Sequence, residues 1–437
     1  MRLLREFERK DLAVAGEELY HFAAELYPIC RSITGSGVRQ TLAAIRQRIP
    51  LDIVEVPSGT PVFDWTVPKE WNIRNAYIKS PDGDCVIEFQ RSNLHVLNYS
   101  VPVHATMPLS ELKPHLFTLP DKPDWIPYRT TYYQESWGFC LPHRQMLSLP
   151  EGEYEVHIDS TLEDGHLTYG ECFLPGRTTD EVLFSCHVCH PSLANDNLSG
   201  VAVATFLAQS LAGLNLRYSY RFLFIPGTIG AITWLARNRE HVGRIRHGLV
   251  LTCLGDTGGF HYKKSRRANA EIDHVVSHVL QRGKEPSDIL EFSPYGYDER
   301  QYCSPGFDLP VGCLMRTVWN SFPQYHTSAD NLDLIQPDAL AASLRVSMAV
   351  VDVLENNRRY CNQNPYCEPQ LGRRGLYRST GGNTIDEEIT ARLWVLNLSD
   401  GQHSLLDIAD RSGLSFQTIC DAVEPLSQAG LLTVIPN

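Results

Sequence analysis

Two histidines and an aspartate lie close together in the segment CHVCHPSLANDNLSG, residues 186–200. They are His187, His190 and Asp196, and a second loop, PQYHTSADN, supplies His326 much later in the chain. Imidazole and carboxylate groups are good zinc ligands, and a catalytic zinc site needs three protein ligands and one open position. Zinc held in this way acidifies a water molecule and polarises a carbonyl group. These residue types therefore predict a metallohydrolase site.

The residues around the first loop indicate how it is positioned. Residues 181–185, EVLFS, have the composition of a buried strand, and residues 201–211 have that of a helix. In open α/β sheets, ligands bind in the crevice beyond the carboxyl ends of the strands, which is where this loop falls. Strand and helix patterns continue to alternate from residue 178 to residue 356. This alternation predicts an α/β fold with a doubly wound, mostly parallel sheet.

The chain of 437 residues is too long for one simple core and is expected to form several domains. After the first 50 residues, short aromatic and β-branched runs are broken by Pro and Gly, as in a β-rich domain. We therefore expect an inserted β-rich domain at residues 51–166, within an α/β domain formed by residues 1–50 and 167–360. Residues 385–437 are expected to form a small C-terminal unit of helix-turn-helix form.

Composition and charge exclude several classes of function. A hydrophobic content of 43% with 10% aromatic residues is typical of a globular chain. The formal net charge of -12 argues against a general nucleic-acid or anionic-membrane binder. The second helix of the C-terminal unit, SFQTICDAVEPLSQAG, carries no Lys or Arg to neutralise phosphates. We therefore expect that unit to serve in packing or in forming a homo-oligomer.

Targeting signals and cysteine motifs bear on the localisation of the protein and on the chemistry of its thiols. The sequence has no run of about 18 apolar residues, so no membrane-spanning helix is expected. The charged N-terminal region lacks an apolar signal core, so we expect a cytoplasmic protein with mostly reduced cysteines. The run CHVCH matches the haem c attachment motif, but such attachment belongs to oxidising compartments. A thiol nucleophile, Cys189 acting with His187 or His326, is an alternative.

Motifs spread over nearly the full length carry a family resemblance. They are PICRSITGSGVRQTL, FDWTVPKEWNI, SNLHVLNYS, IPYRTTYYQESWGFC, CHPSLANDNLSG, PGTIGAI, YDERQYCSPGFDLPVG and YHTSADNLDLI. With them the chain resembles the M28-like zinc aminopeptidases, and in particular a bacterial aminopeptidase-like subfamily. The resemblance implies a zinc exopeptidase-like α/β fold with an inserted β domain and a C-terminal winged helix.

The resemblance also implies the zinc ligands. In the family pattern, zinc is bound by a strand-end histidine, by an aspartate before an Asn-x-Ser-Gly run, and by a histidine in a late Tyr-His-Thr motif. Asp196 and His326 match the last two positions. The first position falls on His190 by the Cys-His-Pro step of the subfamily, or on His187 by its place at the strand end.

The family pattern is broken at a second strand end. The aminopeptidases carry two adjacent acidic residues there, a general base followed by a metal ligand, whereas this chain has Gly227 and Thr228. A further aspartate ligand, expected after the next strand, is also not evident, and the candidates for its place are Thr252 and Asp256. The residues therefore support one metal ion rather than two.

A compact charged cluster, Asp298-Glu299-Arg300, could supply what is missing. We predict that Glu299 is the catalytic base and that Arg300 binds a substrate carboxylate through two hydrogen bonds. Tyr325, which precedes His326, is predicted to contact the substrate. The alternative is that the cluster forms a structural ion pair between Asp298 or Glu299 and Arg300.

Three functions are open at this point. The first is a metal-dependent hydrolase with one zinc-activated water, which cleaves an amide bond in a small aminoacyl or peptidyl conjugate. The second is a degenerate, non-catalytic binding protein of the same fold, which has lost its base at Gly227. The third is a single-zinc acyl transferase or cyclase, since such relatives of the fold also exist.

Overall fold

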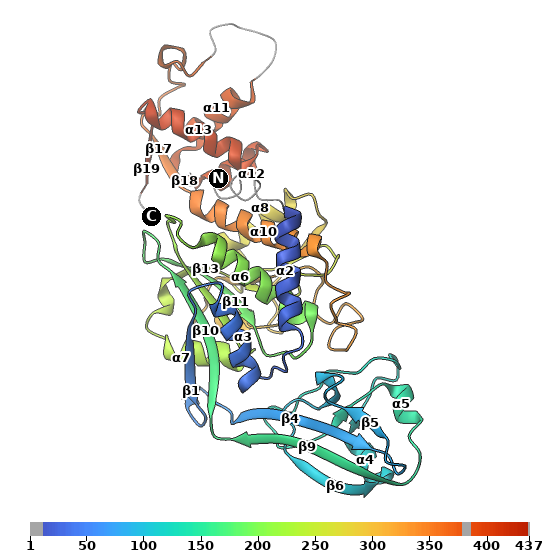
Figure 1. Ribbon diagram of the computed structural model, residues 1–437. Coiled ribbons are helices and arrows are strands. Elements are labelled where there is room, and N and C mark those ends of the chain that lie inside the picture. The colour runs from blue at the N-terminus through green and yellow to red at the C-terminus, as the bar shows by residue number, and fades with distance from the viewer. Residues whose placement is uncertain (1–11, 378–385, 436–437) are drawn as a thin grey trace. The chain divides into compact units, whose positions relative to one another are not determined.

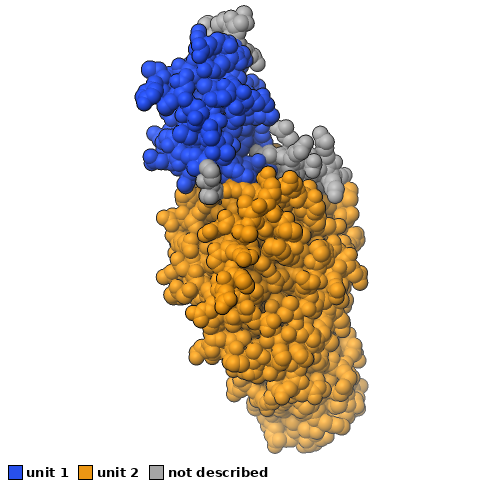
Figure 2. Space-filling view, turned by 90° about the vertical axis from the view of Figure 1, so that its left-hand side faces the viewer, with its two compact units in different colours: residues 1–9, 347–437 blue, residues 10–346 orange. Residues whose placement is uncertain are grey.

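The computed structural model describes residues 12–377 and 386–435 of the chain. The chain divides into two compact units, one within residues 10–346 (orange in Figure 2) and the other from residue 347 onward (blue). In chain order we call the orange part the first unit and the blue part the second unit. The first unit holds the two histidine loops, so it is the unit that positions the candidate site.

An eight-stranded sheet forms the centre of the first unit (Figure 1), with the strand order β1-β10-β12-β11-β13-β16-β14-β15. The neighbouring strands β12, β11, β13 and β16 run parallel, as do β14 and β15. The pairs β1–β10, β10–β12 and β14–β16 are antiparallel. The strands are β1 Asp52–Pro57, β10 His166–Leu174, β11 Glu181–His187, β12 Ser219–Ile225, β13 Ile245–Leu251, β14 Phe260–Lys263, β15 Ser287–Leu290 and β16 Val311–Met315.

The burial of β11 explains its place in the middle of the sheet. All seven residues of this strand are buried, so both faces of the sheet are covered there. A near-continuous apolar run is what a parallel strand with two covered faces requires. The one charged residue, Glu181, accepts two hydrogen bonds of 2.7 and 3.0 Å from the guanidinium of Arg221 on β12. The predicted α/β fold is confirmed.

Helices alternate with these strands and pack against the sheet. α6 packs against β11, β12 and β13, α2 packs against α6, and α3 and α7 pack against β10. Most side chains of α6 are buried, which explains its almost wholly apolar sequence. Within the described residues, no helix is both long enough and apolar enough to cross a membrane. The helices are α2 Leu12–Leu26, α3 Ser36–Arg46, α6 Gly200–Leu211, α7 Ile229–Arg237, α8 Glu271–Gln281, α9 Glu299–Tyr302 and α10 Pro337–Asn356.

A separate four-stranded antiparallel sheet, β5-β4-β9-β6, forms the β-rich part of the first unit (Figure 1). Burial alternates along β9, as expected for a sheet with one face on a core. That core includes Ile78, Tyr154 and Val156. The elements are β4 Glu70–Lys79, β5 Cys85–Glu88, β6 Val103–Pro108 and β9 Glu153–Glu163, with the shorter β2 Pro61–Val62, β3 Trp65–Thr66, β7 Leu116–Phe117, β8 Phe139–Cys140, α4 Leu109–Leu112 and α5 His143–Leu147.

The two strands that flank this β-rich part both belong to the eight-stranded sheet. β1 lies inside residues 51–166, the range predicted for the inserted domain, and it pairs along its whole length with β10. The strands of the four-stranded sheet therefore begin only at Glu70. The domain boundaries stay a prediction.

In the second unit a three-stranded sheet, β18-β17-β19, is combined with the helices α11, α12 and α13. Ser404 caps α12 by accepting a hydrogen bond from the Asp407 backbone, and Gly413, with φ of 75°, ends that helix. β17 lies before the range 385–437 that the sequence predicted for this unit. The elements are β17 Arg359–Asn362, α11 Glu387–Leu398, β18 Asp400–Ser404, α12 Leu405–Ser412, α13 Phe416–Gln428 and β19 Leu432–Val434.

Candidate metal centre

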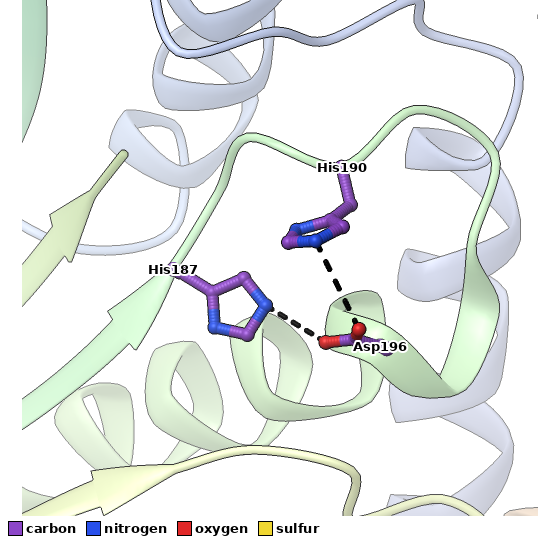
Figure 3. A group of neighbouring side chains, drawn as sticks. All are labelled: His187, His190 and Asp196. Atoms are coloured by element: carbon purple, nitrogen blue, oxygen red, sulfur yellow. Dashed lines mark hydrogen bonds and ion pairs between the residues drawn. The ribbon is translucent and has the colours of Figure 1, made fainter. Parts of the chain in front are cut away.

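The candidate metal centre lies at the carboxyl end of β11 (Figure 3). His187 is the last residue of that strand, and His190 follows in the loop. Asp196 lies in the turn Ala194–Ser199, which leads into α6 and is not helical at Asp196 itself. His187 lies beside Ile225, the last residue of β12, so the ends of two parallel strands meet at this edge. This is the crevice in which ligands bind in sheets of this type.

The carboxylate of Asp196 lies among three imidazoles. The distance from His187 Nε2 to Asp196 Oδ1 is 2.8 Å. Asp196 Oδ2 lies 3.1 Å from His326 Nε2 and 3.9 Å from His190 Nε2. Ligand atoms of His187, His190 and Asp196 all lie within 4.8 Å of one another. The structure therefore brings the four predicted ligands together, and both candidates for the first histidine belong to one cluster.

Burial and neighbouring charges set the protonation of this cluster. Burial alone would raise the pKa of Asp196, but His190 and the hydrogen bonds with His187 and His326 hold that pKa well below its usual range. Burial lowers the pKa of His190 well below the usual value for a histidine, against the opposing charge of Asp196. Asp196 is therefore a carboxylate and His190 a neutral imidazole, which are the forms that bind metals.

Buried carboxylates hold the backbone of the ligand loop. The N–H groups of Asn195 and Asp196 donate to the carboxylate of Asp330 at 2.6 and 3.0 Å. The side chain of Asn195 donates to Asp256 Oδ2 at 2.8 Å, and the Thr317 hydroxyl donates to Asp256 Oδ1 at 2.5 Å. Asp256, which the sequence offered as a further ligand, is thus engaged in positioning Asn195.

Gly200 ends the loop at a point where no side chain fits. A Cβ at this position would clash with Asn197 Oδ1 and would lie 2.5 Å from the carbonyl oxygen of Leu251. Asn197 fills the space instead, because its side chain donates to the Leu251 carbonyl at 3.1 Å and accepts from the Cys253 N–H at 3.3 Å. The Asn-x-Ser-Gly run therefore fastens the ligand loop to the end of β13.

Three tyrosines surround the imidazoles. The ring of Tyr297 stacks on His187 with centroids 4.7 Å apart, and the ring of Tyr325 stacks on His326 at 4.0 Å. The ring of Tyr128 lies 5.1 Å from that of His326, and its backbone N–H donates to the His326 carbonyl at 2.8 Å. The Tyr297 hydroxyl donates to that of Tyr325 at 3.3 Å. Tyr325 therefore lies beside the predicted metal ligand His326, and its contact with a substrate stays a prediction. The sequence analysis did not predict that Tyr128 and Tyr297 would lie beside these imidazoles.

Glu299 and Arg300, the predicted base and substrate-binding residue, make other contacts. Glu299 is buried, and its carboxylate forms an ion pair with Lys263 Nζ at 2.5 Å. The partner of Glu299 in this buried ion pair is Lys263 and not Arg300, the partner that the sequence suggested. The guanidinium of Arg300 lies 5.9 Å from the ring centre of Tyr295. These contacts do not test catalysis or substrate binding, so both roles stay predictions.

Asp298, the first residue of the same charged cluster, is the side chain that lies beside Gly227. Its carboxylate oxygens would be 3.6 and 3.7 Å from a Cβ at Gly227, where an acidic residue was expected. Burial raises the pKa of Asp298 to about 7, while the charge of His187 opposes the shift. Sequence reasoning named the cluster but chose Glu299, and no sequence signal distinguishes the two carboxylates.

Known families and proteins match nearly the whole chain. The family described as a domain of unknown function (DUF4910) matches residues 20–357, and a winged helix-turn-helix family matches residues 358–434. A Clostridium acetobutylicum protein, named for polysaccharide biosynthesis and an aminopeptidase-like domain, is 53% identical over 423 residues, or 96% of this chain and 97% of the relative. A crystal structure from the same organism, of a protein named as a peptidase, has 50% identity and a TM-score of 0.94, covering 99% of this chain and 100% of that one.

Solved aminopeptidases share the fold at much lower identity. The zinc aminopeptidase of Bacillus subtilis is 12% identical, with a TM-score of 0.56 over 77% of this chain and 94% of that one. A peptidase M28 precursor from Shewanella amazonensis is 14% identical, with a TM-score of 0.57 over 81% and 97% of the two chains. Such likeness concerns the fold alone, and it confirms the predicted aminopeptidase fold. The match to a winged helix-turn-helix family confirms the predicted C-terminal module.

Proposed function

Because this chain belongs to the family described as a domain of unknown function (DUF4910) and has the fold of the zinc aminopeptidases, we propose that it is a metal-dependent amide hydrolase with one zinc. The proposed substrate is a small aminoacyl or peptidyl conjugate. The observation that carries the proposal is the convergence of three imidazoles on one buried carboxylate at the end of β11.

The donor set of the cluster fits zinc. In a tetrahedral zinc site with bonds of about 2.0–2.2 Å, neighbouring ligand atoms lie roughly 3.3–3.6 Å apart. The distances of 2.8, 3.1 and 3.9 Å between the Asp196 carboxylate and the three imidazole nitrogens bracket that range. The nitrogen and oxygen atoms that form these imidazole–carboxylate hydrogen bonds are the atoms that would bind the metal. Asp196 and His326, with either His187 or His190, would hold the ion and leave one position open.

The ligands differ in exposed fraction, and this difference indicates the side from which a substrate can enter. The side chains of His187 and Asp196 are 1% and 0% exposed, whereas that of His326 is 34% exposed. We propose that the substrate enters on the His326 side, where the ring of Tyr325 would contact it. Zinc, when bound, supplies a lowered pKa for the attacking water and a polarised substrate carbonyl. Asp330 keeps Asp196 in place by accepting its backbone N–H.

The name of the Clostridium relative favours a sugar-linked substrate as a second, narrower candidate. A pocket of about 400 Å³ lies between the β2–β3 hairpin and the helices α7 and α9. Aromatic faces beside polar groups suit a sugar ring, whose C–H groups stack while its hydroxyls form hydrogen bonds. We propose that Trp65→Ala raises KM for a sugar-linked amide and leaves kcat unchanged. The pocket is lined by Phe63, Trp65 and Phe307 with the polar Asp64, Arg239 and Gln301.

The rival functions predict different products. A non-catalytic binding protein retains a conjugate without converting it, and an acyl transferase or cyclase yields a new amide or a ring instead of a free acid. Mass spectrometry of the products, with and without an added amine acceptor, separates hydrolysis from transfer.

The experiment that tests the proposal is the zinc content of the purified protein, measured by elemental mass spectrometry. We expect about one zinc per chain in the wild type, and a loss of roughly tenfold or more in His326→Ala and Asp196→Asn. His104→Ala is the matched control, because His104 is an exposed histidine on β6. Absence of zinc from the reconstituted wild type would refute the proposal, and full zinc content in both variants would refute the ligand assignment.

A further inference from the structure

Asp298 has a buried carboxylate that lacks a hydrogen-bond partner. Its side chain is 0% exposed. Among the described residues, neither Oδ1 nor Oδ2 of Asp298 has a hydrogen-bond partner. Burying a carboxylate without a partner is unfavourable, and most buried polar groups in proteins are satisfied. The presence of aspartate at this position therefore needs an explanation.

The carboxylate of Asp298 lies beside Gly227, next to the strand end that carries the predicted metal ligand His187. A Cβ at Gly227 would lie 3.6 Å from Asp298 Oδ1, 3.7 Å from Oδ2 and 3.2 Å from the Cβ of His187. Because glycine has no side chain, space is left between this carboxylate and the strand end that carries His187. The adjacent Tyr297 stacks on the His187 ring, which holds the Asp298 loop against the cluster.

The usual structural roles of a buried aspartate do not apply to Asp298. It precedes α9, but its side chain makes no capping hydrogen bond to that helix. The carboxylate of the neighbouring Glu299 forms an ion pair with the ammonium group of Lys263, with Oε1 and Nζ 2.5 Å apart. Lys263 also donates to the carbonyl groups of Ser293 and Tyr295 at 3.0 and 2.8 Å.

We infer that Asp298 is a catalytic residue, the proton acceptor for the attacking water, supplied by another loop in place of an acidic side chain at position 227. The inference rests on the proposed hydrolysis. The water oxygen bonds to the carbonyl carbon of the amide, and one water proton passes to the Asp298 carboxylate. The C–N bond then breaks, and the leaving nitrogen takes that proton from Asp298. The products are an acid and an amine, and Asp298 is again a carboxylate.

The test compares the full-length wild type, Asp298→Asn and the matched control Asp308→Asn on a panel of aminoacyl p-nitroanilides. Asp308 forms ion pairs with Arg266 and Arg267 and has no part in the cluster. For Asp298→Asn we expect kcat to fall about 100- to 10,000-fold, with KM within about threefold of the wild type. Asp308→Asn keeps the activity of the wild type.

Two readouts that do not depend on activity accompany the kinetics. Asp298→Asn should keep its zinc, and its melting temperature should equal or exceed that of the wild type, because an unpartnered buried charge is removed. A structural role would lower the melting temperature. In the double variant Gly227→Glu/Asp298→Asn, recovery of about tenfold or more in kcat over Asp298→Asn supports the inference.

The outcomes separate the inference from the function on which it rests. Asp298→Asn with kcat within about threefold of an active wild type would overturn the inference alone. The same conclusion follows if Asp298→Asn loses zinc or melts at a lower temperature. A zinc-loaded wild type that cleaves no probe would overturn the proposed hydrolysis, and the inference with it.

Discussion

Replacing Asp330 by alanine should loosen the ligand loop by an amount that follows from its hydrogen bonds. Asp330 is fully buried and accepts the backbone N–H groups of Asn195 and Asp196 at 2.6 and 3.0 Å. A buried donor left without a partner costs about 1–3 kcal/mol, so two such donors cost about 2–6 kcal/mol. The lower figure is roughly a thirtyfold change in the equilibrium for opening the loop. Asp330→Asn keeps one acceptor oxygen, so its free-energy cost should be about half that of Asp330→Ala.

Hydrogen exchange followed by mass spectrometry measures this effect directly. In Asp330→Ala, peptides covering residues 194–197 should exchange about thirtyfold faster or more, and zinc affinity should fall roughly 10- to 100-fold because the ligand loop is less well held. Asp333→Ala, which removes an exposed carboxylate from the same segment, is the control. Exchange within about threefold of the wild type in Asp330→Ala would refute the role assigned to Asp330.

Three further predictions concern other parts of the molecule. Gly200→Ala forces Asn197 and the end of β13 apart and should lower the free energy of unfolding by about 1–3 kcal/mol. Gly243→Ala is the control, because a Cβ there meets nothing within 4 Å. Equal melting temperatures of the two variants would contradict this prediction. Burial lowers the pKa of His247 from 6.5 to about 4. Neutral His247 therefore makes its full contribution to the free energy of unfolding above about pH 6.5. That contribution, about 3 kcal/mol, is lost as the pH falls towards 4. His247→Gln should flatten the fall in melting temperature between pH 7 and pH 4.5, and parallel curves would refute this. Because α13 carries no Lys or Arg, the protein should not bind a short DNA duplex in a salt-dependent way, as fluorescence anisotropy would show.

Much of the α/β part of the fold is predictable because its signal is local. β11 is mostly apolar between Glu181 and His187, and α6 follows it with small apolar residues, so the type and burial of each element can be predicted from its own sequence. The edges of the sheet are different, because β1 and β10 are separated by more than one hundred residues and pair antiparallel. Nothing in the short run DIVEV indicates whether it joins the large sheet or the β-rich part.

The same contrast holds within the site. His187, His190 and Asp196 are recognisable from residue type and spacing, because one strand end and one turn carry all three. The partners that position them come from far along the chain. Asp330 acts on the loop through backbone N–H groups, which no side-chain pattern reveals, and Tyr128 reaches His326 from the β-rich part.

The choice between Asp298 and Glu299 shows where reasoning from sequence ends. Successive residues at a helix start point about 100° apart, so the adjacent carboxylates of Asp298 and Glu299 point in different directions. Which of them faces the cluster depends on Lys263, a residue on β14 that binds Glu299 and leaves Asp298 facing Gly227. In the sequence alone, Gly227 stands where the family pattern has an acidic residue, which indicates that a catalytic acid has been lost. In space, the missing side chain leaves room for a carboxylate from another loop, so the absence of an acid at one strand end does not by itself indicate a loss of catalysis.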